Sequence, residues 1–283
     1  MKESRTEPIL DFYLLIPYYN NLRGLIRSLQ SVRYDAARYA LLIIDDGSFE
    51  RLQFSDLEPY LPGGTAATII TLAENGGITK ALNSGLKWLE QRTDFRFVAR
   101  LDCGDLCAPD RFTRQVEFLD HHPGTDLVGS WCLFSDFSSE SSFQYKTPTE
   151  HKKIARGMYF RNIFIHPTVM WRASVGQMTA TYPEKFPFAE DYGFFYEIIS
   201  KGHAAVLPEN LVICEINPKG LSMRYRKEQL KSRIKVVKAF GTNKVLSIIG
   251  VMKLWLLGVI PYIWVYRIKR WAYGVRFRPS FEL

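Results

Sequence analysis

Two short acidic motifs of this 283-residue chain carry carboxylates that could bind a ligand. Asp102 and Asp105 belong to RLDCGD, and Asp46 belongs to IDDGS. Carboxylate oxygens are the ligands that hard divalent cations prefer, so Asp102 and Asp105 are candidate metal ligands. Aspartates that follow an apolar run are also ordinary turn formers. The RLDCGD motif therefore predicts either an ion site or a plain turn, and the rest of the sequence decides between them.

The motif IPYYN places aromatic rings at the end of another apolar run. A ring at such a position could stack on a nucleobase, and an acid from IDDGS could accept a hydrogen bond from an imide N–H of uracil or thymine. Each residue also has a structural interpretation. Tyr19 would then be a half-buried aromatic at a strand end, and Asp46 a capping residue for the turn at Gly47.

Apolar runs precede these motifs and have the composition of buried strands, while leucines at helical spacing separate them. In chain order, we predict strands over 12–17, 39–44, 67–72 and 95–101 and helices over 22–32, 79–91 and 110–121. The second half adds a strand with a Ser-rich loop over 126–150, strands over 163–171 and 204–216, and a helix over 190–201. Such alternation is typical of an open, mostly parallel sheet, which binds ligands at the carboxyl ends of its strands. We therefore expect the polar motifs to form one site.

The overall composition is that of a compact α/β protein: 47% of the residues are apolar, 14% aromatic and 23% charged. These values exclude a disordered chain, a disulfide scaffold and a fibrous repeat. The four cysteines form no CxxC pair and the five histidines do not cluster with them, which argues against structural zinc and favours reduced thiols. The N-terminal residues lack the order of a signal peptide, so we expect no export.

The net charge of +8 is concentrated in the C-terminal fifth of the chain. Residues 219–278 carry fifteen Lys and Arg against one acidic residue, a local excess of 14 positive charges. Within this part, residues 245–266 are almost entirely apolar and would span about 33 Å as a helix. Lys253 and Pro261 interrupt the run. Three interpretations stay open: shallow membrane attachment, which we favour, a membrane span, or packing on the soluble domain.

Five motifs together resemble those of the family 2 glycosyltransferases. In order they are IPYYN, IDDGS, ENGGITKALNSGL, RLDCGDLCAPDRF and AEDYGFFYEIISKG, and they cover roughly residues 11–215. The resemblance implies an α/β protein of the GT-A fold, with a Rossmann-like, mostly parallel central sheet flanked by helices. We expect a GT-A domain at 1–218 and, at 219–283, a basic and hydrophobic helical extension that associates with membranes.

The resemblance also implies the roles of individual residues. It makes Asp191 the general base that deprotonates the acceptor hydroxyl in an inverting displacement, with Glu190 orienting the acceptor or Asp191 and His166 lining the cleft. In the structural alternative, Glu190 and Asp191 are first-turn carboxylates favoured by the helix dipole, and His166 is a strand-end histidine. The residues implied to bind the donor lie at strand ends or in and after the glycine loop: Pro17, Tyr19, Asp46, Asn75, Gly76, Lys80 and Asp102.

One residue departs from the family pattern. Family members commonly carry an acidic, often metal-ligating residue where this chain has Gly104. The resemblance implies a divalent metal, Mn²⁺ or Mg²⁺, that neutralises the donor diphosphate. With Gly104 in place, Asp105 directly or Asp102 through water would have to take over, or metal dependence would weaken.

We therefore expect an inverting glycosyltransferase that moves a sugar from a UDP- or dTDP-type donor to a hydroxyl of a glycan or polyprenyl-linked acceptor. The expected setting is bacterial surface polysaccharide or O-antigen synthesis at the cytoplasmic face of the inner membrane, with the extension on anionic lipid. The alternative is a non-catalytic nucleotide-sugar-binding protein with a degenerate site. A Rossmann dehydrogenase would need GxGxxG where the chain has PYYNNLRG, and the apolar run makes lipid a better partner than nucleic acid.

Overall fold

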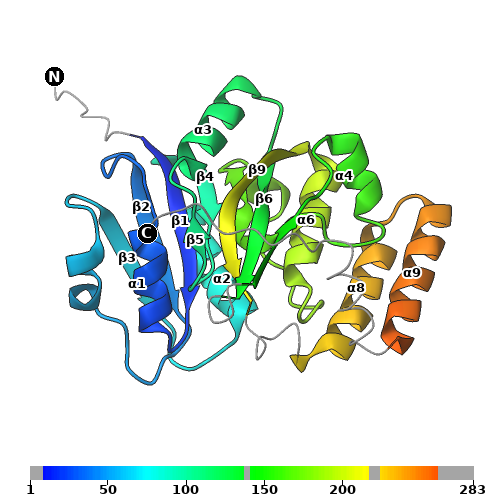
Figure 1. Ribbon diagram of the computed structural model, residues 1–283, viewed down its shortest axis with the longest axis horizontal. Coiled ribbons are helices and arrows are strands. Elements are labelled where there is room, and N and C mark those ends of the chain that lie inside the picture. Colours follow the sequence, from blue (N-terminus) through cyan, green and yellow to red (C-terminus); the bar gives the residue numbers. More distant parts are fainter. Residues whose placement is uncertain (1–8, 137–140, 217–223, 261–283) are drawn as a thin grey trace.

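A single mixed sheet with helices on both faces forms the body of the protein (Figure 1). The computed structural model describes residues 9–136, 141–216 and 224–260. Along the sheet the strand order is β3-β2-β1-β4-β8-β6-β9-β5, and β7 pairs with β6. The α/β class and the flanked central sheet that the sequence predicted are confirmed.

The first half of the chain forms the parallel part of the sheet, as predicted. Side chains on β1 alternate between two hydrophobic cores: Tyr13 and Leu15 face one core, while Phe12 and Leu14 face the other. Helix α2 covers the first of these faces, and helices α1 and α3 cover the second. The elements of this half are β1 (Leu10–Tyr18), α1 (Leu22–Gln30), β2 (Tyr39–Asp45), 3₁₀ turns at Phe54–Asp56 and Glu58–Tyr60, β3 (Ala66–Thr71), α2 (Ile78–Glu90), β4 (Phe95–Arg100), β5 (Leu106–Cys107) and α3 (Arg111–His121).

The second half mixes strand directions. Strand β8 runs antiparallel to both β4 and β6, whereas β9 runs parallel to β6 and antiparallel to β5. The predicted strand over 163–171 is largely wrong: a 3₁₀ turn occupies His166–Thr168 and only β8 remains, because Pro167 has no N–H to donate to a sheet. The elements are β6 (Leu127–Asp136), β7 (Ser141–Tyr145), α4 (His151–Gly157), β8 (Met170–Arg172), α5 (Val175–Met178), α6 (Glu190–Lys201) and β9 (Ala204–Glu215).

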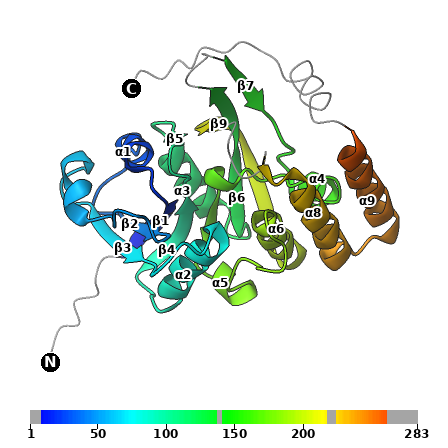
Figure 2. The same ribbon diagram turned by 90° about the horizontal axis from the view of Figure 1, so that it is seen from below.

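Two C-terminal helices extend the fold beyond α6: the first packs on α6 and the second packs on the first (Figure 2). They are α8 (Arg226–Phe240) and α9 (Lys244–Val259). Helix α8 buries Leu230, Val236 and Val237 in the same core as α6, so it is an integral layer of the fold. Helix α9 touches the body through Gly250, where an added Cβ would meet the carbonyl oxygen of Tyr159 at 2.0 Å. Within the described part of the chain, no helix combines the length and the apolar character that crossing a bilayer requires.

Candidate active site

The carboxyl ends of β1 and β2 lie side by side and hold two of the predicted motifs. In the parallel ladder Pro17 pairs with Ile44 and Tyr18 with Asp45. Asp45 is buried and its carboxylate accepts hydrogen bonds from the N–H groups of Ser48 and Leu52, which fixes the turn after β2. The neighbouring Asp46 is thereby directed toward the next loop of the chain.

Asp46 joins the end of β2 to the glycine loop before α2. Its Oδ1 accepts the Gly76 N–H at 2.8 Å, and its Oδ2 accepts the Gly77 N–H at 2.9 Å and the Asn75 amide at 3.1 Å. Burial raises the pKa of Asp46, and these N–H donors and the charge of Lys80 oppose that rise. The structure therefore brings Asp46, Asn75, Gly76 and Lys80 together, as the sequence predicted. A carboxylate oxygen has two lone-pair sites, so Asp46 keeps the capacity to accept a further donor.

Two exposed aromatic rings lie at the rim of this site. Tyr19 is 43% exposed and Phe49 is 89% exposed, and their ring centroids are 6.4 Å apart. Asn20, in a left-handed conformation with φ 49°, connects them, because its Oδ1 accepts the Phe49 N–H and its own N–H donates to Ser48. Sequence reasoning missed Phe49, although an exposed phenylalanine directly after a DDGS turn was a usable signal.

The DCGD loop follows β4 and is built on a buried arginine. Arg100 is fully buried and donates from Nη2 to Oδ1 of Asp102 at 2.6 Å. Asp102 is 36% exposed, whereas Asp105 is buried and its Oδ1 accepts the Glu215 N–H at 2.8 Å. Burial, together with the charge of Asp102, raises the pKa of Asp105. The two predicted metal ligands thus have different surroundings. Asp102 pairs with a guanidinium, whereas Asp105 accepts a hydrogen bond from a backbone N–H.

These residues do not form a ligand set for a divalent cation in the arrangement observed. Asp102 is held by Arg100, Asp105 is buried against the end of β9, and Gly104 contributes no side chain. Across residues 9–136, 141–216 and 224–260, no group of three or more His, Cys, Asp or Glu side chains is placed to hold a metal ion. The donor set therefore does not fit the metal that the family resemblance implies.

Glu190 and Asp191 begin helix α6 and face the DCGD loop. Burial and the charge of Asp191 raise the pKa of Glu190 to about 7, and Oε2 of Glu190 has no hydrogen-bond partner within the described chain. Burial also raises the pKa of Asp191, whose Oδ2 accepts the Asn162 amide at 2.9 Å and whose Oδ1 accepts the Tyr192 N–H. The negative charge of Asp102 contributes to both increases. The carboxylates at the start of α6 therefore lie within electrostatic range of Asp102 in the loop after β4.

His166 lies behind these carboxylates in an aromatic setting. Its Nε2 is 2.9 Å from the Tyr182 hydroxyl, and its ring packs against Tyr182 and Phe195. Burial and the nearby charge of Arg100 lower its pKa well below the usual value, so the imidazole is neutral at physiological pH. Burial raises the pKa of Tyr182, and the charges of Asp191 and Glu190 add to this rise, so the His166–Tyr182 pair lies within electrostatic range of the two carboxylates.

Comparisons with known proteins agree on one assignment. The sequence model described as Glycosyl transferase family 2 matches residues 13–175. The amylovoran biosynthesis glycosyltransferase AmsE of Erwinia amylovora is 27% identical over 236 residues, covering 80% of this chain and 84% of AmsE.

Solved structures show the same fold. S. aureus TarS (residues 1–349) in complex with UDP-GlcNAc has a TM-score of 0.63 at 17% identity, over 87% of this chain and 71% of that one. A mannosyltransferase of Pyrobaculum calidifontis, in complex with GDP-Man and Mn²⁺, has a TM-score of 0.60 at 14% identity, over 92% and 79%. These likenesses confirm the GT-A fold that the sequence motifs implied.

The raised pKa of Glu190 predicts a pH-dependent stability. Since its pKa rises from 4.5 to about 7 on folding, the folded state loses stability as the pH rises through this interval. Glu190→Gln removes the charge and should stabilise the protein at pH 8 by roughly 1–3 kcal/mol, with little effect at pH 4.5. Urea unfolding at the two pH values measures the difference. Glu184→Gln, at an exposed position, is the control, and an equal effect of both variants would contradict the prediction.

Proposed function

The chain belongs to glycosyl transferase family 2, and from this premise we propose that it moves a sugar from a nucleoside diphosphate donor to an acceptor hydroxyl with inversion. One observation carries the proposal. Asp191 is a carboxylate of raised pKa at the start of a helix, oriented by Asn162 and facing the loop after β4. A base with a pKa closer to neutral accepts a proton from a hydroxyl more effectively than an ordinary carboxylate does.

In the proposed mechanism the oxygen of the acceptor hydroxyl attacks the anomeric carbon of the donor sugar. Asp191 removes the hydroxyl proton during this attack, and the nucleoside diphosphate leaves. Glu190 lies beside Asp191, and its buried Oε2 is placed to orient the acceptor or to receive one of its hydrogen bonds. His166, neutral and held by Tyr182, shapes the wall behind the two carboxylates. Its packing supports a positioning role, and as a neutral imidazole it does not serve as a general acid near neutral pH.

For the donor, we propose a uridine or thymidine nucleotide that lies on the edge formed by β1 and β2. The exposed rings of Tyr19 and Phe49 offer a stacking surface beside Pro17, and Asp46 can accept the imide N–H of the base. Asn75 and Gly76 allow the backbone to approach the ribose, and Lys80 adds a positive charge near Asp46. TarS, which has the same fold, is in complex with UDP-GlcNAc and supports the uridine alternative.

For the acceptor, we propose a glycan or polyprenyl-linked sugar of a bacterial surface polysaccharide, at the cytoplasmic face of the inner membrane. The relative AmsE is named for the biosynthesis of amylovoran, which supports a role in such synthesis. A divalent metal, as present in the mannosyltransferase neighbour, stays part of the proposal only if the carboxylates after β4 rearrange to bind it.

Helix α9 supports the proposed membrane attachment of the C-terminal extension that begins at residue 219. Large apolar side chains are exposed along it at helical spacing: Val245, Ile248, Ile249, Met252, Trp255, Leu256 and Val259. Exposed lysines occur along α8 at similar spacing: Lys227, Lys231, Lys235 and Lys238. An apolar stripe with basic residues beside it is the pattern of a helix that lies in the plane of an anionic membrane. The second half of the predicted apolar run, from residue 261, lies outside the described residues.

A donor screen tests the proposed activity. Purified protein is incubated with UDP-, dTDP- and GDP-sugars, and the released nucleoside diphosphate is measured with and without acceptor extract. We expect release from a uridine or thymidine donor that increases with acceptor. Binding of a nucleotide sugar without any release under these conditions would favour the non-catalytic alternative.

The general base is tested by Asp191→Asn and Asn162→Ala. Asp191→Asn should lower kcat about 100-fold or more and leave donor binding unchanged, because positioned base catalysis contributes about that much. Since protonation of Asp191 abolishes the base, the rate should fall as the pH decreases through its raised pKa. Asn162→Ala removes a donor that lowers this pKa, so the acidic limb of the pH–rate profile should move to higher pH. An unshifted limb would separate Asn162 from Asp191, and normal turnover by Asp191→Asn would remove Asp191 from the mechanism.

Membrane attachment is tested on exposed residues that can change without disturbing the fold. Ile248→Ser, Met252→Ser and Trp255→Ser together should abolish co-sedimentation with vesicles of phosphatidylglycerol and phosphatidylethanolamine while leaving thermal unfolding unchanged. Lys227→Gln, Lys231→Gln and Lys235→Gln together should weaken binding only at low salt, because each exposed charge contributes about 1 kcal/mol and is screened. Sedimentation of the triple serine variant at the wild-type level would contradict a role for α9.

A further inference from the structure

Gly104 has no side chain, and side chains from distant parts of the sequence occupy the space beside it. Gly104 has φ +109°, and a Cβ built on it would lie 2.8 Å from Oε2 of Glu215 and 3.7 Å from Nη2 of Arg27. An aspartate at this position would therefore meet a carboxylate already in place and would adopt a backbone conformation that L side chains avoid. Glycine is the residue that this arrangement requires.

Arg27 and Glu215 form an ion pair at this point, 188 residues apart in sequence. Nη2 of Arg27 donates to Oε2 of Glu215 at 2.7 Å and to the carbonyl oxygen of Gly104 at 3.1 Å. The backbone N–H of Glu215 in turn donates to Asp105. The pair thus connects α1, the loop after β4 and the end of β9, and about a third of each side chain is exposed.

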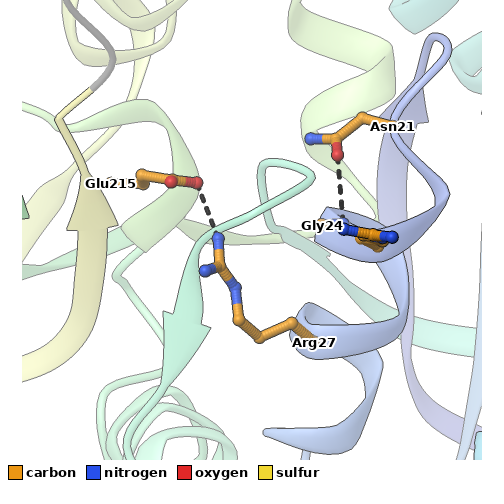
Figure 3. Close-up of a pocket in the computed structure, with 5 residues that line it drawn as sticks. Asn21, Gly24, Arg27 and Glu215 are labelled. Carbon is orange, nitrogen blue, oxygen red and sulfur yellow. Dashed lines mark hydrogen bonds and ion pairs between the residues drawn. The ribbon is translucent and has the colours of Figure 1, made fainter. Parts of the chain in front are cut away.

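A pocket opens next to the ion pair (Figure 3). Its volume is about 330 Å³, and its lining consists of Asn21, Arg23, Gly24, Arg27 and Glu215. Two arginines against one glutamate give the lining an excess of one positive charge. Because Arg27 contacts Gly104, this pocket adjoins the loop where the family pattern places the metal that neutralises the diphosphate.

We propose that Arg27 is a ligand of the donor diphosphate, and that Glu215 holds its guanidinium next to Gly104 until the donor binds. The inference rests on the proposed function and deepens it. A guanidinium matches the oxygens of a phosphate in geometry and charge, and it keeps its charge at all physiological pH values. Arg27 thus supplies a partly exposed positive charge beside the DCGD loop, where the described carboxylates do not form a metal site.

The proposal assigns opposite effects to the two partners of the ion pair. Diphosphate oxygens compete with Glu215 for the same guanidinium, so removing the charge of Glu215 favours the diphosphate. If Glu215 were instead a carboxylate that replaces the missing residue at position 104 as a metal ligand, removing its charge would weaken donor binding in the presence of metal. The two roles are therefore distinguishable by binding alone.

The experiment is titration calorimetry of UDP and uridine, each in chelator and in Mn²⁺. In chelator, Arg27→Gln should weaken UDP binding about ten- to a hundredfold and leave uridine binding unchanged, since only UDP carries the diphosphate. Arg27→Lys should recover part of the loss. Arg33→Gln, which removes an exposed charge six residues further along, is the matched control and should bind UDP as the wild type does. Glu215→Gln should bind UDP more tightly than the wild type in chelator.

Three results would overturn the proposal. Wild-type affinity of Arg27→Gln for UDP would remove Arg27 from the diphosphate site and leave the transferase assignment intact. A loss of UDP affinity by Glu215→Gln that is confined to Mn²⁺ would make Glu215 a metal ligand instead. Absence of UDP binding by the wild-type chain would reject the uridine donor together with this inference.

Discussion

Arg100, a buried cation at the end of β4, acts on the acidic groups of the site. Arg100 has no exposed surface, and a charge in that position is costly unless a carboxylate compensates it. Asp102 supplies this compensation directly, and the charge of Arg100 also opposes the raised pKa values of Asp105 and Glu190. The same charge lowers the pKa of His166. Burial is the largest cause of these shifts; the arginine adds to the lowered pKa of His166 and moderates the raised pKa values of Asp105 and Glu190.

This arrangement explains why the loop after β4 differs from the pattern expected of a metal site. Asp102 points an oxygen at Arg100, and Asp105 is committed to the backbone of β9. The vacancy at Gly104 is occupied by an arginine and a glutamate that neutralise each other. The charges at this loop are therefore balanced within the protein, whereas the family pattern places metal-binding carboxylates there.

The sequence predicted the parts of the fold that depend on local patterns. Short apolar runs ended by DDG, ENGG and DCGD mark β2, β3 and β4 because a buried strand must end where polar residues begin, and the parallel order then brings those ends together. The proximity of Asp46, Asn75 and Gly76 followed from this reasoning. The Arg27–Glu215 pair and the contact of Asn162 with Asp191 did not, since each joins residues from distant segments through side chains that could equally face solvent. The sequence predicted a strand instead of the turn at His166–Thr168, because the apolar residues on both sides of Pro167 have the composition of a buried strand.

Helix α8 connects the site with the C-terminal surface. It packs on α6, the helix that begins with Glu190 and Asp191, and Phe240 at its end stacks on Tyr196. Arg233 of α8 is also close enough for its charge to lower the pKa of Asp191 against the effect of burial. A cation from the basic segment therefore tunes the proposed base directly. For that reason α8 belongs physically with the catalytic body, whereas α9, whose outer face is exposed and apolar, has the character of a surface that needs a further partner.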